Sequence, residues 1–250
     1  MNEKKSTELF NYFIFFGMLI SVLFVSVLKI KANPGETAVQ IIAAVGAMFG
    51  VTSTILAAKG NILNFVIGGL GAVIETYLLW RNGTTSMFLL YLFYFIPMDV
   101  VGFLSWKRKG ATAHKEVKAQ RMNGRKWLFV ALGYAAAVCV AFTVSYLSAK
   151  SDIGSGIPAK MITDALATAA TIVAIVMMTF AYVEQWYIWT LVNVSNMALW
   201  TVAIITASRE GADSGYAVVM LIKYFFYFVN GLNAIRIWLK LSKKEEHLEV

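Results

Sequence analysis

Polar groups interrupt one of the most apolar parts of this sequence, where Gln185, Trp186, Trp189, Asn193 and Asn196 follow one another closely. The spacing of Trp186, Trp189 and Asn193 places them on one face of a helix. That face offers flat aromatic surfaces and a carboxamide, which are the groups that bind a planar polar molecule. The stretch therefore predicts a ligand site on a helix.

The surrounding composition is that of a membrane protein. Of the 250 residues, 59% are hydrophobic and only 14% are charged, whereas roughly a quarter of the residues in a soluble domain are charged. The apolar runs are long and continuous, so they predict an all-α membrane protein rather than a barrel of short alternating strands. The single cysteine, Cys139, excludes an intrachain disulfide.

Eight apolar runs are long enough to cross a bilayer, which takes about 20 residues of helix. The first run lacks a clear cleavage site, so we interpret it as a retained helix and not as a signal peptide. The predicted spans are residues 10–28, 38–58, 62–80, 87–106, 127–147, 161–182, 186–206 and 216–238.

Positive charge is concentrated in the one long connection, residues 107–126. Basic segments stay on the cytoplasmic side of a membrane. Eight spans with a cytoplasmic N-terminus would place this loop and both termini in the cytoplasm. We therefore attribute the net charge of +8 to topology and expect no nucleic acid partner. A basic loop could also bind anionic lipid.

The predicted helices fall into two similar groups of three. In each group the second helix ends at a charged glycine turn, and the third is rich in aromatic residues and ends in Trp followed by basic residues, at Trp106 and Trp238. The extra helix between the groups makes the two repeats parallel, which is a transporter architecture with its site at the repeat interface. The predicted organisation is 1–36 (N-terminal helix), 37–107 (repeat 1), 108–157 (basic loop and linker helix), 158–240 (repeat 2) and 241–250 (cytoplasmic tail).

This pattern resembles the PnuC family of vitamin transporters over residues 38–240. The resemblance is carried by the three-one-three plan, by the motif of Trp186, Trp189 and Asn193, and by Tyr94-Phe95-x-Pro97-Met98 with Gly102 and Trp106. It implies a fold similar to that of the SWEET sugar transporters. It also implies uptake of nicotinamide riboside, a precursor of NAD, across the bacterial inner membrane by facilitated diffusion, with a cytoplasmic kinase that traps the vitamin. Relatives carry thiamine, riboflavin or other nucleosides.

Nicotinamide riboside is a flat pyridinium cation, so a tryptophan face could stack on it. Asp99 stands where many members of the family have an amide. It could counter the charge of the ligand, or it could pair with Lys223. Asn61 and Asn64 could complete the site, or they could cap the following helix. Pro97 is expected to be a hinge or a tolerated kink.

The expected binding residues are Gln185, Trp186, Trp189, Asn193, Asn196, Asn61, Asn64, Tyr94, Met98, Asp99, Lys223, Tyr224, Tyr227 and Asn230. The sequence offers no catalytic constellation and no cluster of metal ligands, so we expect neither an enzyme nor a cofactor. Three hypotheses remain open: a nicotinamide riboside transporter, a transporter of thiamine or another flat vitamin, and a membrane sensor or scaffold. The chain could also form a homo-oligomer.

Overall fold

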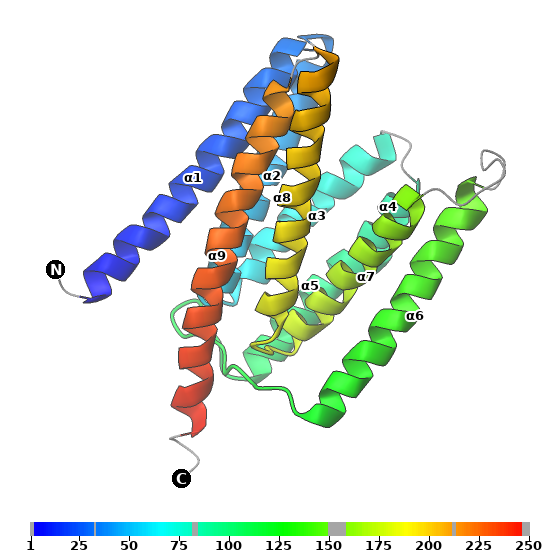
Figure 1. Cartoon of the computed structure of the whole chain (residues 1–250). Coiled ribbons are helices and arrows are strands. Elements are labelled where there is room, and N and C mark those ends of the chain that lie inside the picture. Colours follow the sequence, from blue (N-terminus) through cyan, green and yellow to red (C-terminus); the bar gives the residue numbers. More distant parts are fainter. Residues whose placement is uncertain (1–2, 33, 82–84, 150–158, 212–213, 247–250) are drawn as a thin grey trace.

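The computed structural model describes residues 3–32, 34–81, 85–149, 159–211 and 214–246, and within these ranges it is built from helices, as predicted. Eight helical rods run side by side at varied tilts (Figure 1). The rods are α1 (Glu3–Ala32), α2 (Thr37–Ala58), α3 (Leu63–Arg81), the joined segments α4 (Thr85–Leu90), η2 (Tyr91–Phe95) and α5 (Ile96–Arg108), α6 (Gly124–Ala149), α7 (Ala159–Thr179), α8 (Gln185–Glu210) and α9 (Gly215–Glu246).

The helices correspond to the eight predicted apolar runs, and several of them extend beyond these runs. Six rods in the described ranges, which are α1, α2, α3, α4–α5, α6 and α8, are long and apolar enough to cross a membrane. Helix α7 contributes a shorter apolar stretch, Ala165–Thr179. The structure thus confirms the all-α class and supports six of the eight expected spans by length and composition.

The fourth rod is broken in the middle by one turn of π-helix, η2. The amide of Ile96 donates to the carbonyl of Tyr91, five residues back, instead of four. Pro97 lies just after this turn, in the first turn of α5, where it has no N–H to donate to the preceding turn. The irregularity expected from Pro97 is therefore a π-helical turn, a feature that often accompanies functional sites.

The closest helix pairs are α2 with α3 and α8 with α9, while α6 lies against α7, and α1 lies against α2 and α9. Glycine allows the tightest of these contacts. A methyl group on Gly17 of α1 would lie 2.2 Å from the ring of Phe226 in α9, and one on Gly71 of α3 would lie 3.4 Å from the carbonyl oxygen of Gly46 in α2. The glycines of α3 thus serve helix packing, as their place in an apolar run predicts.

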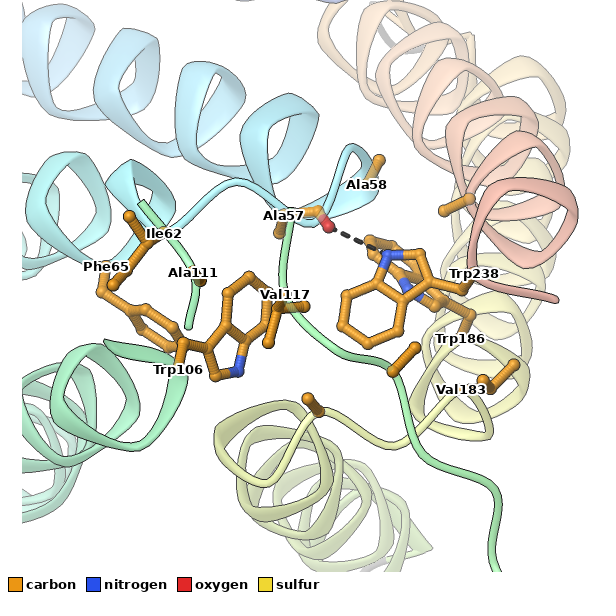
Figure 2. Packing of buried hydrophobic residues seen from close by; sticks show 13 residues of the cluster. Ala57, Ala58, Ile62, Phe65, Trp106, Ala111, Val117, Val183, Trp186 and Trp238 are labelled. Atoms are coloured by element: carbon orange, nitrogen blue, oxygen red, sulfur yellow. Dashed lines mark hydrogen bonds between the residues drawn. The ribbon is translucent and has the colours of Figure 1, made fainter. Parts of the chain in front are cut away.

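The largest buried hydrophobic cluster lies at one end of the bundle, where the segment between α5 and α6 crosses between the helices (Figure 2). Trp106 and Trp238 are fully buried there, with ring centroids 5.5 Å apart. Ala111, Val117 and Ala119 of the crossing segment are buried among the same side chains. The basic loop predicted from the sequence is therefore partly a core element.

Candidate functional site

A cavity of about 580 Å³ lies between the two groups of helices. Its walls come from α2, α3, the π-helical turn with the end of α4, α7, α8 and α9. The lining is mostly apolar, with a small number of hydroxyl and amide groups, as is usual for pockets that bind small molecules. The lining residues are Gly50, Ser53, Thr54, Ala57, Gly68, Leu90, Tyr91, Phe95, Ala167, Thr168, Thr171, Ile175, Met178, Trp186, Trp189, Val192, Asn193, Asn196, Tyr224 and Tyr227.

Helix α8 provides the wall that the sequence predicted. Trp186, Trp189, Asn193 and Asn196 all line the cavity. Asn196 donates a hydrogen bond to the carbonyl of Val192 in its own helix (2.8 Å). The Asn193 side chain, by contrast, forms no hydrogen bond with any residue in the described ranges. Its carboxamide is therefore available to a molecule in the cavity.

Three predicted site residues carry buried polar atoms that have no hydrogen-bond partner in the part of the chain that the structure describes. They are both amide atoms of Gln185, the indole nitrogen of Trp186 and the amide nitrogen of Asn230. Each such atom costs about 1–3 kcal/mol if it stays unpaired. Gln185 is 0% exposed and Asn230 is 1% exposed. Of these three residues, Trp186 lines the cavity, where a polar ligand or water can satisfy its indole nitrogen.

Two buried tryptophans donate hydrogen bonds to residues that line the cavity. Trp106 of α5 donates from its indole nitrogen to the carbonyl of Met178 in α7 (2.9 Å). Trp238 of α9 donates in the same way to the carbonyl of Ala57 in α2 (3.1 Å), as Figure 2 shows. Each indole therefore fixes the last turn of a cavity-lining helix.

The turns that precede α3 and α8 are also built alike. Gly60 and Ala181 occupy them, with left-handed φ angles of 67° and 59°. Phe65 follows Gly60 at the same distance along the chain as Trp186 follows Ala181. Phe65 packs edge-on against Trp106 (centroids 4.9 Å apart), and Trp186 packs edge-on against Trp238 (6.2 Å).

Eight predicted residues lie outside the cavity lining, which are Gln185, Asn61, Asn64, Tyr94, Met98, Asp99, Lys223 and Asn230. Asn61 accepts a hydrogen bond from the amide of Leu63 (2.9 Å) at the start of α3 and donates to the carbonyl of Ala113 (2.9 Å). Buried Asn64 donates to the carbonyl of Asn61 (2.7 Å). Of the two interpretations of Asn61 and Asn64, this geometry favours the helix start over the site.

Tyr94 and Met98 also stay off the cavity wall. The hydroxyl of Tyr94 donates to the carbonyl of Ile172 in α7 (2.7 Å), so it joins the broken rod to α7. Met98 is half-buried one turn further along the same rod. Tyr94 thus holds the rod in position next to the cavity without facing into it.

Asp99 lies directly behind the glycines of α3. A methyl group on Gly68 would be 3.7 Å from one carboxylate oxygen of Asp99, and a methyl on Gly69 would be 3.8 Å from the other. Gly68 itself lines the cavity. The carboxylate therefore lies behind the cavity wall, where its negative charge can act on a ligand with only glycine between them.

Lys223 lies behind the opposite wall. Its Nζ is 4.8 Å from the ring centroid of Tyr224 and 5.8 Å from that of Tyr227, and both tyrosines line the cavity. No ion pair joins Asp99 to Lys223 among the described residues. The carboxylate that interacts electrostatically with Lys223 is that of Glu75. The hypothesis of an Asp99–Lys223 ion pair is therefore not supported.

The α2 and α7 walls were not predicted from the sequence. Their polar lining consists of hydroxyl residues, among them Ser53, Thr54, Thr168 and Thr171. Thr54 and Thr171 donate to carbonyls four residues earlier in their own helices. A signal does exist in the sequence, because Gly50 and Thr54 are one helical turn apart on one face.

A helical membrane bundle with an apolar and aromatic cavity between two groups of helices defines a small-molecule transporter. The sequence profile of the nicotinamide mononucleotide transporter family matches residues 40–240. The chain belongs to this family, whose members include the PnuC proteins and are transporters, not enzymes.

Relatives agree with this assignment. The chain is 30% identical over 207 residues to the nicotinamide riboside transporter PnuC of Neisseria mucosa, covering 81% of this chain and 73% of that protein. It is 23% identical over 205 residues to PnuC of Haemophilus influenzae, covering 81% of each. The fold is similar to the crystal structure of the vitamin B3 transporter PnuC, with a TM-score of 0.60 and 28% identity over 90% of both chains.

Proposed function

We propose that this protein takes up nicotinamide riboside by facilitated diffusion, with α8 supplying the main binding face. The observation that carries the proposal is the cavity wall made by Trp186, Trp189 and Asn193. An indole face stabilises a desolvated cation by up to about 2 kcal/mol. The free carboxamide of Asn193 can pair with the carboxamide or the ribose of the ligand, since an amide both donates and accepts.

The charge around the cavity supports a cationic ligand. Asp99 lies behind Gly68, on the α3 side, opposite the wall made by α8. A buried carboxylate next to a cavity stabilises a positive charge in it, because the low dielectric strengthens the attraction. Two flat vitamins, nicotinamide riboside and thiamine, carry such a charge, and the shared charge makes thiamine the second candidate. The relatives' names favour nicotinamide riboside.

The proposed architecture is one N-terminal helix followed by two parallel three-helix repeats around a linker helix. In this reading α2, α3 and α4–α5 form residues 37–107, and α7, α8 and α9 form residues 158–240. The matched contacts of Trp106 and Trp238 support it, because each third helix fixes the first helix of the other repeat. Substrate would then move by alternating access between the repeats.

We further propose that all eight rods cross the inner membrane of a bacterial cell, with both termini in the cytoplasm. The basic segment that follows α5 supports this orientation through the positive-inside rule. A cytoplasmic kinase would trap the vitamin after entry without having to bind the transporter. A homo-oligomer is compatible with the exposed apolar faces of the helices.

Flux into liposomes tests the proposal. Purified protein is reconstituted, and entry of labelled nicotinamide riboside down its gradient is measured beside protein-free liposomes. We expect saturable uptake that needs no ion gradient, and competition by unlabelled nicotinamide riboside. The Trp189→Ala and Asn193→Ala variants should lose most of this flux, since both remove contacts to the ligand.

The outcome also separates the candidates. Selective flux of thiamine would keep the architecture and change the substrate. Flux that depends on a proton gradient would exclude facilitated diffusion. Flux of neither vitamin would contradict the proposal.

A further inference from the structure

The segment between α5 and α6 does more than connect two helices. Residues 109–123, which we call the strap, run across the end of the bundle (Figure 1, Figure 2). Val117 is 2% exposed, although the neighbouring Glu116 and Lys118 are exposed to solvent. The strap thus places small apolar side chains in the core and keeps its charged side chains outside.

The strap is hydrogen-bonded to both turns that precede a cavity-lining helix. The amide of Val117 donates to the carbonyl of Gly60 (2.9 Å), in the turn before α3. The amide of Gln120 donates to the carbonyl of Ala181 (2.9 Å), in the turn before α8. One short segment therefore ties the two groups of helices together at this end.

The attachment to the α8 turn is the stronger of the two. The amide of Val183 donates to the carbonyl of Gln120 (3.0 Å), which completes a two-way bridge. The carboxylate of Glu184, only 4% exposed, accepts from the guanidinium of Arg121 (3.1 Å) and from the amide of Met122 (3.2 Å). A charge-assisted contact to a buried carboxylate is stronger than a neutral hydrogen bond.

A further contact holds the first residue of the strap. Lys109 donates from its ammonium group to the carbonyl of Phe180. Burial, together with the neighbouring positive charge of Lys126, lowers the pKa of Lys109 to about 8. The start of the strap is thus held at the end of α7, next to the turn before α8.

The carboxylate that holds the strap belongs to a residue next to the proposed ligand face. Glu184 directly precedes Gln185 and Trp186, and Trp186 lines the cavity. A shift of the strap away from Glu184 would therefore act on the first turn of α8. The buried side chains of the strap also pack in one cluster with Ala57 and Trp186, which line this end of the cavity.

We propose that the strap is the gate on this face of the membrane, and that Glu184 is the positioning residue that latches it to the turn before α8. Release of the substrate on this side requires the strap to leave that turn. This inference rests on the proposed transport function. It assigns a gating role to a segment whose basic composition alone indicates only topology.

Cross-linking tests the gate directly. Gln120 and Tyr182 form a bridge between neighbouring extended segments, where paired Cα atoms are about 5 Å apart and within reach of a disulfide. Gln120→Cys with Tyr182→Cys is made in a Cys139→Ser background and reconstituted. We expect oxidation to reduce flux of nicotinamide riboside at least tenfold and reduction to restore it.

The matched control is a disulfide within the strap. Thr112 and Lys115 form an antiparallel bridge inside it, so Thr112→Cys with Lys115→Cys adds a cross-link without tying the strap to a helix. Flux through this variant should stay the same after oxidation. Equal flux through oxidised and reduced Gln120→Cys/Tyr182→Cys protein would overturn the gate.

A second measurement does not depend on the substrate. Thr54 lines the cavity, so Thr54→Cys in the same background reports access from the strap side to a membrane-impermeant maleimide. Glu184→Gln should raise the labelling rate at least threefold, because it weakens the latch. The control is Glu116→Gln, an exposed carboxylate on the strap. Equal labelling in the two variants would overturn the latch even if nicotinamide riboside were not the substrate.

Discussion

Helices α3 and α8 start in the same way and then differ. Each follows a residue with a left-handed φ angle, and each carries an aromatic ring that packs on a buried tryptophan. One turn after these aromatic rings, α3 has Gly68 and α8 has Trp189 at the equivalent position. Both residues line the cavity. The shared starts build the frame, and the two helices differ at the positions that line the cavity.

The comparison also explains the space in the cavity. Bulky groups enter from α8, whereas α3 contributes Gly68 to the lining. The methyl position of Gly68 is 2.8 Å from the hydroxyl oxygen of Ser53, so even alanine is tight there. The two helices therefore start alike but present different side chains to the cavity.

The largest predicted effect is a loss of ligand affinity on the α8 side of the cavity. Trp189→Ala should weaken binding of nicotinamide riboside by about 30-fold, since it removes about 2 kcal/mol of stacking. Calorimetric titration of the purified variant measures this. Trp127→Ala on α6, a residue that is 42% exposed, is the control and should keep the affinity of the parent protein. If Trp189→Ala kept the affinity of the parent protein, the ligand would have to bind elsewhere.

The next prediction concerns the frame. Trp106→Phe and Trp238→Phe each remove one indole hydrogen bond, while the accepting carbonyl keeps its bond from a backbone amide, so each change costs about 0.5–1.5 kcal/mol. Because the two contacts are alike, the two variants should lower the thermal midpoint by similar amounts. Thermal unfolding in detergent measures both. A large effect of one and none of the other would show that the frame is not shared.

A smaller effect is expected behind the α3 wall. Asp99→Asn removes a carboxylate that lies next to Gly68, which lines the cavity. The affinity for the cationic nicotinamide riboside should fall about fivefold, or about 1 kcal/mol, as expected for a charge that does not touch the ligand. Competition binding against a neutral nucleoside, uridine, provides the control, because the charge should not alter any residual uridine binding. Equal losses for both ligands would mean that Asp99 acts on packing and not on charge.

The smallest prediction sharpens the comparison of the two turns. Gly60 has a φ angle of 67°, and the equivalent residue, Ala181, has 59°. Gly60→Ala should therefore fold, at a cost of about 1 kcal/mol for a side chain in the left-handed region. Thermal unfolding measures this as a modest drop in the midpoint. Failure to fold would show that the turn before α3 needs glycine for packing against Leu241, 3.1 Å from the added methyl group.

The rods and the α8 face could be predicted from the sequence because both rest on periodicity. A run of about 20 apolar residues gives a spanning helix, and the spacing of Trp186, Trp189 and Asn193 gives a face. The α2 and α7 walls were missed because serine and threonine inside a helix usually bond to their own backbone, as Thr54 and Thr171 do. Which face of such a helix meets the cavity depends on its rotation in the bundle.

The strap was missed for a different reason. Its basic residues were interpreted as a topology signal of a cytoplasmic loop. Yet Val117 and Ala119, which are buried, alternate with exposed Glu116 and Lys118. Alternation of this kind is typical of an extended segment with one buried side. The hydrogen bonds to Gly60 and Ala181 are contacts across the fold, and neither composition nor spacing contains them.

Direct binding is the most decisive measurement for the central claim, which is that the α8 face binds a flat cationic vitamin. Purified protein is titrated with nicotinamide riboside, thiamine, riboflavin and uridine, following tryptophan fluorescence and heat. The account predicts selective binding of nicotinamide riboside, with quenching that Trp189→Ala removes. Binding that prefers uridine or riboflavin, or binding that survives both Trp189→Ala and Asn193→Ala, would contradict it.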